Sequence, residues 1–123
     1  PNIVQIFGAG REEGVRFLAM EFVPGRGLDA VLDAARDART QQPTATVVGW
    51  GARLARALAC AHAAGIVHRD VKPSNVRITS DDEPVLLDFG IAHEHGAAGL
   101  TLSGPFMGTP LYAAPEQIAG NAE

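Results

Sequence analysis

The chain has 123 residues, of which 46% are hydrophobic and 20% charged, and its formal net charge is -4. This composition is typical of one small globular domain, and a mild charge without a basic tract argues against a nucleic-acid partner. The single cysteine, Cys60, excludes an internal disulfide, and no apolar run reaches the roughly 18–20 residues that a membrane span needs, so we expect no membrane contact within this segment.

The N-terminal part has the pattern of a β-hairpin that continues into an extended segment. Residues 3–7 and 15–20 are β-branched and aromatic runs, and glycines and charged residues separate them. Residues 21–23 then stay extended, and residues 24–27 break the strand. Because Pro1 is not a methionine and stands at the brink of a strand, we infer a fragment of a longer protein.

Two amphipathic helices are predicted next, because apolar residues recur there every three or four positions. In the first helix these positions are Leu28, Val31, Leu32 and Ala35. In the second they are Val47, Gly51, Leu54, Leu58 and Ala61.

The second helix also has residues that can cap its two ends, and it contains two residues, Trp50 and Cys60, whose side chains can serve either function or packing. Thr44 or Thr46 can cap its N-terminus, and Gly65 ends it. Trp50 and Cys60 are both expected to pack in the core, Trp50 rather than binding a ligand and Cys60 rather than acting as a reactive thiol.

Most of the chemistry lies between His68 and Asn75 and at Asp88. Residues 76–78 and 85–87 are short β-branched and aliphatic runs around a turn rich in aspartate and proline. They predict a hairpin that carries Asn75 at one mouth and Asp88 at the other. Two polar side chains far apart in the sequence are therefore expected to lie close together.

Four of these residues form a set with one evident use. Asp70, Lys72, Asn75 and Asp88 supply a carboxylate, an ammonium group, a carboxamide and a second carboxylate. Magnesium prefers hard oxygen ligands, and an ammonium group is a compact positive charge for a phosphate. The sequence therefore predicts a site for phosphoryl transfer from a nucleotide with its magnesium.

Three motifs carry a resemblance to a known family. Residues 68–75 read His-Arg-Asp-Val-Lys-Pro-Ser-Asn, residues 88–90 read Asp-Phe-Gly, and residues 108–116 read Gly-Thr-Pro-Leu-Tyr-Ala-Ala-Pro-Glu. In this order and at these spacings they resemble the catalytic loop, metal-binding loop and substrate-binding end of protein kinases. Lys72 indicates the Ser/Thr branch of the protein kinases, and the residues in these motifs are most similar to those of eukaryotic-like Ser/Thr kinases of bacteria.

The resemblance implies an α+β, protein-kinase-like fold, of which this chain is a part. Residues 1–20 would end the N-lobe with its last two strands, residues 21–27 would be the hinge and linker, and residues 28–123 would be the first half of the mainly helical C-lobe. The implied activity is transfer of the ATP γ-phosphate to Ser or Thr of protein substrates in signal transduction. The parent would have a cytoplasmic kinase domain, with or without a membrane anchor.

The resemblance also implies roles at the site. Asp70 would accept or orient the substrate hydroxyl, Lys72 would neutralise the γ-phosphate, and both magnesium ligands would be oxygens, from Asn75 and Asp88. Phe89 would have His68 as its neighbour. ATP would lie at the hinge, against Met20, Glu21 and Val23.

A regulatory set is implied as well. Arg69 is placed to grip a phosphate on the activation segment, and Thr101 and Ser103 stand where related bacterial kinases autophosphorylate. Autophosphorylation would require self-association. Thr109 would hydrogen-bond the catalytic aspartate and lysine.

Arg77 departs from the family pattern. Kinases usually place an aliphatic side chain there, under the adenine. We expect the methylene stem of Arg77 to cover the ring while its guanidinium reaches solvent.

Two other functions stay open. A pseudokinase scaffold would have lost catalytic groups, whereas Asp70, Lys72, Asn75 and Asp88 are intact. A small-molecule phosphotransferase of the kinase-like group would lack a segment ending in Ala-Pro-Glu. A Val-Ala-x-Lys upstream would favour the kinase, and without the upstream glycine loop and lysine the piece alone is expected to be inactive.

Overall fold

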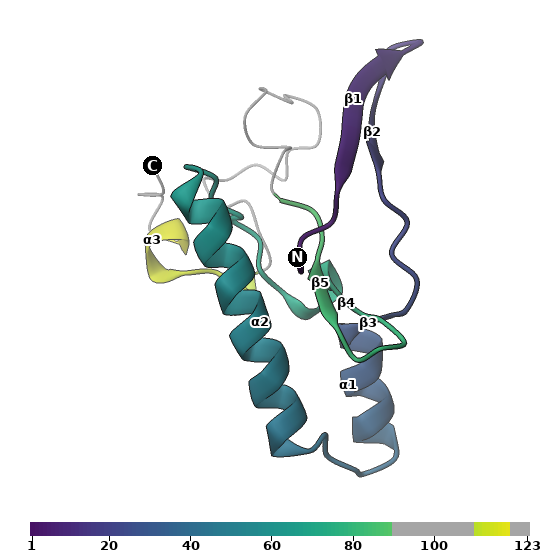
Figure 1. Ribbon diagram of the computed structural model, residues 1–123, viewed down its shortest axis with the longest axis vertical. Coiled ribbons are helices and arrows are strands. Elements are labelled where there is room, and N and C mark those ends of the chain that lie inside the picture. Colours follow the sequence, from purple (N-terminus) through teal and green to yellow (C-terminus); the bar gives the residue numbers. More distant parts are fainter. Residues whose placement is uncertain (90–109, 119–123) are drawn as a thin grey trace.

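The computed structural model describes residues 1–89 and 110–118, and within them two small sheets lie beside two long helices (Figure 1). The strands are β1 (Ile6–Glu12), β2 (Val15–Met20), β3 (Arg26–Gly27), β4 (Val76–Ile78) and β5 (Pro84–Leu86). The helices are α1 (Leu28–Asp37), α2 (Thr44–Ala63) and α3 (Pro115–Ile118), with 3-10 turns η1 (Pro73–Asn75) and η3 (Pro110–Tyr112). The β1–β2 hairpin projects away from α1 and α2.

The predicted N-terminal hairpin is confirmed. Strands β1 and β2 pair antiparallel from Ile6 opposite Met20 to Glu12 opposite Val15. The turn between them, Glu13 and Gly14, has φ of 48° and 86°. Positive φ at both residues of a two-residue loop matches the right-handed twist of the flanking strands, so the loop closes the hairpin without splaying it.

The first strand begins later than predicted. Residues 3–7 were expected to form it, but Val4 instead donates its backbone N–H to the Leu86 carbonyl at 3.0 Å, and Leu86 donates to the Asn2 carbonyl at 2.9 Å. The chain therefore runs beside β5 before it enters β1. Val4 and Leu86 are both buried, and this apolar contact outweighs continuation of the hairpin.

The three-stranded sheet contains a strand that the sequence did not predict. Residues 24–27 were expected to break the chain, yet Arg26 and Gly27 pair with β4, opposite Ile78 and Arg77. Gly25 makes this return possible because its φ is +137° and a Cβ atom there would collide with the Ile78 carbonyl. Only glycine tolerates both conditions.

Of the two predicted termini of α2, only the C-terminal one is confirmed. Pro43 occupies the N-cap position and no side chain caps the helix, so the predicted threonine cap is wrong. At the other end Gly65 has φ +75°, its N–H donates to the His62 carbonyl at 2.9 Å, and Ile66 donates to the Ala61 carbonyl at 2.9 Å. This pair of bonds is a Schellman motif, which confirms Gly65 as the helix stop.

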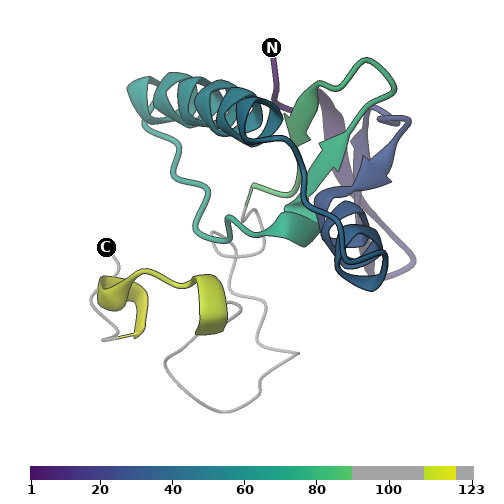
Figure 2. The same cartoon turned by 90° about the horizontal axis from the view of Figure 1, so that it is seen from below.

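The core lies between the helices and the three-stranded sheet. Helix α1 contacts β3 and β4, whereas α2 contacts β5 (Figure 2). The buried cluster comprises Trp50, Val76, Ile78 and Leu86, with Leu28, Val31, Leu54, Leu58 and Phe89 packed against it. Trp50 also donates its Nε1–H to the backbone oxygen and the Oδ1 atom of Asp82, at 3.2 and 3.1 Å. The predicted core role of Trp50 is confirmed.

Two other predictions for α2 are wrong. Val47 is 48% exposed and Gly51 is exposed, because the buried face follows Trp50, Ala57 and Ala61 instead. Cys60 is exposed rather than in the core.

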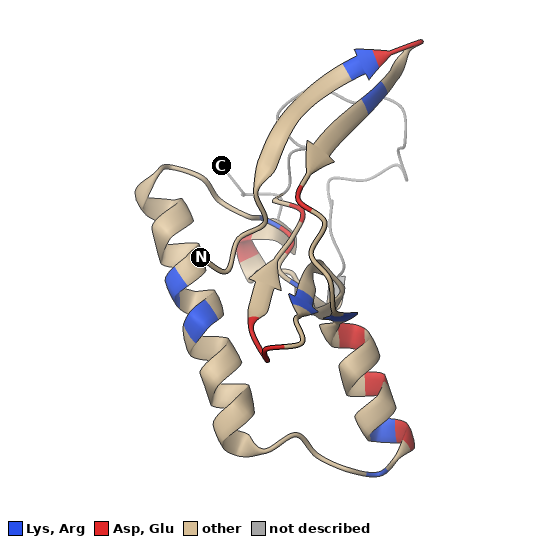
Figure 3. Cartoon of the chain, turned by 45° about the vertical axis from the view of Figure 1, so that its right-hand side comes forward, with Lys and Arg blue, Asp and Glu red and all other residues tan. Residues whose placement is uncertain are grey.

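Charges are distributed unevenly over the described elements. Acidic residues lie along α1 and at the β4–β5 turn, whereas the only Lys or Arg residues on α2 are Arg53 and Arg56 (Figure 3). Arg53 Nε lies 3.2 Å from Glu83 Oε2, which ties α2 to the hairpin turn. Among the described residues, no helix is long and apolar enough to cross a membrane.

Candidate active site

The loop between α2 and β4 carries most of the predicted site. It follows the Schellman turn and ends in η1, where Pro73 fixes φ at the first position of the turn. His68 and Asn75, near its two ends, are 1% and 7% exposed. The loop is therefore anchored by two buried polar side chains, and the residues between them are held over the sheet.

Asp70 is the electrostatic centre of this loop. Its Oδ2 atom lies 2.7 Å from Lys72 Nζ. Asn75 Nδ2 donates to the same Oδ2 atom at 3.1 Å and to the Asp70 backbone oxygen at 2.8 Å. The structure thus brings together the three residues that the sequence singled out in this loop.

The pKa of Asp70 is shifted by opposing effects. Partial burial raises it, but the hydrogen bond and the charge of Lys72 lower it, with further lowering from Asn75 and His68. The lowering wins, and the pKa lies below 3.8. Asp70 is therefore a carboxylate at neutral pH, able to accept a hydrogen bond from a hydroxyl.

Asn75 precedes β4 and Asp88 follows β5, so the two residues lie at the two strand ends that form the open mouth of the β4–β5 hairpin. Val76 pairs with Leu86, and Leu87 donates its N–H to the Asn75 carbonyl at 2.8 Å, so Leu87 lies opposite Asn75 and Asp88 is the next residue along the chain. Asp88 is exposed and has φ 49°.

The oxygens at this mouth fit a magnesium ion. The amide nitrogen of Asn75 is used on Asp70, so its remaining polar atom, Oδ1, is an acceptor, and Asp88 adds a carboxylate. Two hard oxygen ligands beside bound phosphates are what Mg²⁺ takes in nucleotide sites, since it retains several waters.

His68 joins the catalytic loop to the segment before Asp88. Its Nδ1 atom accepts the Asp70 N–H at 3.2 Å, so its Nε2 atom, 2.8 Å from the Leu87 oxygen, must donate. The His68 and Phe89 rings lie 4.6 Å apart, which confirms the predicted neighbourhood.

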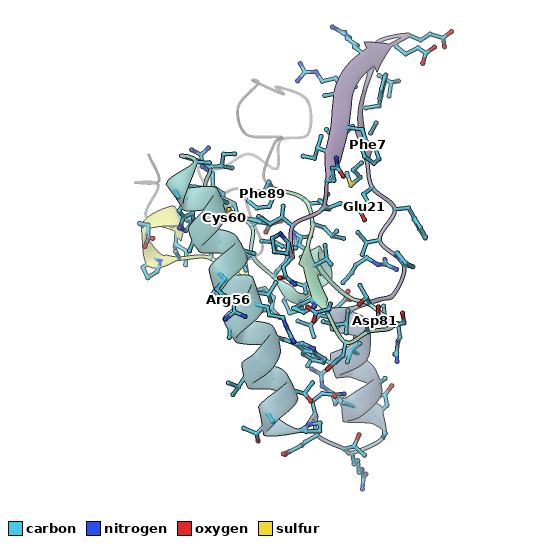
Figure 4. The ribbon with its side chains drawn as sticks, in the orientation of Figure 1. Phe7, Glu21, Arg56, Cys60, Asp81 and Phe89 are labelled. Atoms are coloured by element: carbon cyan, nitrogen blue, oxygen red, sulfur yellow. The ribbon has the colours of Figure 1, made fainter. Side chains whose placement is uncertain are left out.

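The predicted adenine site is extended backbone at the end of β2. Met20 is half-buried opposite Ile6, and Glu21 donates its N–H to the Gln5 carbonyl at 2.8 Å. Val23 is 6% exposed, whereas Glu21 is exposed and its Oε2 atom accepts the Gln5 N–H at 3.4 Å (Figure 4).

Arg77 does not lie as predicted. Its guanidinium was expected in solvent, but Nη2 donates to the Gly25 carbonyl, and Nε is buried with no hydrogen-bond partner among the described residues. The cause is β3, since pairing of Gly27 with Arg77 brings the Gly25 carbonyl within reach.

Gln117 is a site residue that sequence reasoning missed. Its Nε2 atom donates to the Arg69 carbonyl at 2.7 Å, across 48 positions of sequence. Its Oε1 atom accepts the Ala114 N–H at 3.1 Å. The only signal in the sequence was its place directly after the Ala-Pro-Glu motif.

Other predicted residues lie apart from this cluster. Thr101, Ser103 and Thr109 lie outside the described residues. A cavity of about 460 Å³ lies against Phe89 and Arg69, next to exposed Cys60 on α2 (Figure 4). Asp70 is not among the residues that line this cavity.

Comparison with known proteins gives one consistent result. The family model described as "Protein kinase domain" matches residues 1–123. The serine/threonine-protein kinases PknJ and PknH of Mycobacterium tuberculosis are 44% and 40% identical over 98% of this chain, which covers 20% and 19% of their lengths. A probable serine/threonine-protein kinase of Clostridium perfringens is 32% identical over 98% of the chain and 17% of its own length. The chain spans about a fifth of the length of these relatives.

Proposed function

The chain belongs to the protein kinase domain family, and from that premise we propose that the protein carrying it transfers the γ-phosphate of ATP to serine and threonine hydroxyls of other proteins. The observation that carries the proposal is the Asp70 carboxylate, ionised and held by Lys72 and Asn75 beside the hairpin mouth at Asp88. All four groups that phosphoryl transfer needs from this part of a kinase are present.

Asp70 acts on the acceptor hydroxyl. Its carboxylate accepts the hydroxyl hydrogen bond and orients the oxygen toward the phosphorus, and a general base of this kind contributes roughly 10²–10⁴-fold. Lys72, which neutralises Asp70 in this structure, lies within reach of the transferred phosphoryl group and balances its charge. Asn75 holds the Asp70 carboxylate from the other side.

Magnesium and adenine sites complete the proposal. Asn75 Oδ1 and the Asp88 carboxylate hold Mg²⁺, which supplies charge neutralisation at the phosphates. The backbone of residues 21–23, with Met20 at its start, receives the adenine edge. In this assignment residues 1–20 belong to the N-lobe, residues 21–27 to the hinge and linker, and residues 28–123 to the C-lobe.

The same assignment also implies how the kinase is regulated and where in the cell it works. Arg69 binds a phosphate on Thr101 or Ser103, Thr109 bonds to Asp70 and Lys72, and two copies of the kinase associate to phosphorylate each other. The kinase domain works in the cytoplasm, where its phosphate donor ATP is found.

The direct test is transfer of radiolabelled phosphate from ATP to a mixed pool of Ser-, Thr- and Tyr-containing peptides by the full-length protein. We expect label on serine and threonine and none on tyrosine. ATP binding without transfer to any protein or peptide would support a binding scaffold instead. Transfer to a small-molecule hydroxyl alone would support a small-molecule phosphotransferase.

A further inference from the structure

The peptide unit that joins Arg69 to Asp70 is held at both of its polar atoms. Its N–H, on Asp70, donates to His68 Nδ1 at 3.2 Å. Its carbonyl, on Arg69, accepts from Gln117 Nε2 at 2.7 Å. The first of these bonds comes from within the catalytic loop, whereas the second comes from α3, 48 positions further along the chain.

This peptide unit needs such support because of its backbone geometry. Arg69 has φ +65°, in the left-handed region that residues with a Cβ disfavour. Strained residues of this kind persist only where the surrounding structure fixes them. Because the Arg69–Asp70 peptide sets the direction of the Asp70 Cα–Cβ bond, its orientation also sets where the carboxylate points.

Gln117 suits this task through the two ends of its carboxamide. The Nε2 end donates to the Arg69 carbonyl, and the Oε1 end accepts the Ala114 N–H at 3.1 Å. The Gln117 backbone N–H returns to the Ala114 carbonyl at 3.0 Å. The side chain is therefore fixed in its own turn before it reaches the catalytic loop, which lowers the entropic cost of the long-range bond.

We propose that Gln117 is a positioning residue for Asp70, which fixes the peptide before the catalytic carboxylate and couples α3 to the catalytic loop. The inference rests on the proposed kinase function. Gln117 touches neither phosphate nor hydroxyl; it acts through the Arg69 carbonyl. Its effect is expected on the rate of phosphoryl transfer rather than on nucleotide binding, since the proposed metal ligands, Asn75 and Asp88, flank the β4–β5 hairpin rather than the Arg69–Asp70 peptide.

The test compares three variants of the full-length protein. Gln117→Glu keeps the length and the acceptor for Ala114 but loses the donor and places a carboxylate against the Arg69 carbonyl. Gln117→Met keeps the length without charge or hydrogen bonds. Gln41→Glu, in the exposed linker between α1 and α2, is the matched control for the added charge.

Two measurements separate positioning from folding. Single-turnover transfer to a peptide gives the rate of the chemical step, and calorimetry with MgADP gives the stoichiometry and Kd of nucleotide binding. We expect both Gln117 variants to transfer phosphate about 10–100-fold more slowly, as small misplacements of a catalytic group do. Their MgADP stoichiometry and Kd should match those of the wild type. Gln41→Glu should match the wild type in its single-turnover rate, its MgADP stoichiometry and its Kd.

Three other outcomes would contradict either the role proposed for Gln117 or the proposed function. An unchanged single-turnover rate in Gln117→Glu and Gln117→Met would show that the hydrogen bond from Gln117 to the Arg69 carbonyl does not orient Asp70. A loss of rate matched by a loss of MgADP stoichiometry would show that Gln117 only supports folding. A wild-type protein that binds MgADP but transfers no phosphate would overturn the proposed function itself, and with it the role assigned to Gln117.

Discussion

Lys72 and Asp70 form an ion pair of 2.7 Å, with about a quarter of each side chain exposed to solvent. Because Lys72 supplies the largest of the interactions that lower the pKa of Asp70, it keeps the carboxylate ionised despite its partial burial. In the proposed function this pair would have two uses: it would keep the base ionised before substrate binds, and it would hold a positive charge next to the transferred phosphoryl group.

Replacing Lys72 should change the titration of Asp70. In Lys72→Met burial remains and the attraction is lost, so the pKa of Asp70 should rise, and the acid limb of kcat/KM should move to higher pH. Because these interactions hold the folded-state pKa of Asp70 below its ordinary value, they also stabilise the fold at neutral pH, and this stabilisation is lost as the pH falls through the folded pKa. Carboxylate ¹³C shifts followed against pH measure the change, and an unmoved titration would contradict the pairing.

Asp70→Asn should abolish transfer while leaving nucleotide binding intact. The variant keeps the size of the side chain but loses the base, so the turnover should fall by at least about 10²-fold. The Kd for MgATP should stay within about twofold, because the proposed function assigns Asp70 to the acceptor hydroxyl and not to the nucleotide. Turnover comparable to the wild type would rule out Asp70 as the base.

Asp88→Ala should behave differently from Asp70→Asn. It removes a proposed magnesium ligand, so both the turnover and the affinity for MgATP should fall, whereas the affinity for metal-free ATP should change little. Calorimetric titrations with and without Mg²⁺ measure this. Equal losses of affinity in the two titrations would argue against a metal-ligand role.

Trp50→Phe should destabilise the fold through one lost hydrogen bond. The ring stays buried, but the Nε1 donor to Asp82 disappears, and Asp82 holds a left-handed φ of 61° at the hairpin turn. We expect a loss of about 1 kcal/mol in the free energy of unfolding, measured by denaturant titration of the full-length protein. Asp82→Asn, which keeps both acceptors and tolerates positive φ, is the control and should change little.

The parts of the site that sequence predicted are those with a local signal. Asp70, Lys72 and Asn75 lie within one short loop, and the pattern of residues 76–87 was enough to predict the β4–β5 hairpin that separates Asn75 from Asp88. Trp50 followed from its bulk on an apolar helix.

The missed features depend on contacts between distant segments. Strand β3 exists because Gly25 allows Arg26 to return beside Ile78, and no pattern in two residues indicates a strand. The same return draws Arg77 to the Gly25 carbonyl. The bond from Gln117 to Arg69 likewise has no local signature. Hydrophobic spacing predicted α2 and the inward positions of Leu54, Leu58 and Ala61, but it wrongly included Val47, which is exposed.

Phosphorylation of the activation segment should control activity. The double change Thr101→Ala with Ser103→Ala should lower the turnover of the full-length protein markedly, because a phosphate with roughly −1.5 to −2 charge could no longer pair with Arg69. Arg69→Ala should give a similar loss and little more when combined with the double change. Phosphopeptide mapping after incubation with ATP tests this directly; unmodified Thr101 and Ser103 in an active preparation, or losses that simply add, would contradict it.

Arg77→Met should tighten nucleotide binding. The change removes a guanidinium whose Nε is buried without a hydrogen-bond partner among the described residues, a costly arrangement, and leaves an apolar, flexible side chain on the face of β4 near the proposed adenine site. The lost bond to the Gly25 carbonyl opposes this gain, but the backbone pairing of Arg26 and Gly27 with β4 still holds the linker in place. We therefore expect the Kd for MgATP to fall severalfold with kcat unchanged.

Arg56→Met, at an exposed position of α2, is the control for the lost charge and should leave the Kd as it is. A weaker affinity in Arg77→Met alone would mean that the guanidinium supports the adenine site, by holding Gly25 or by stacking on the ring, more than its burial costs.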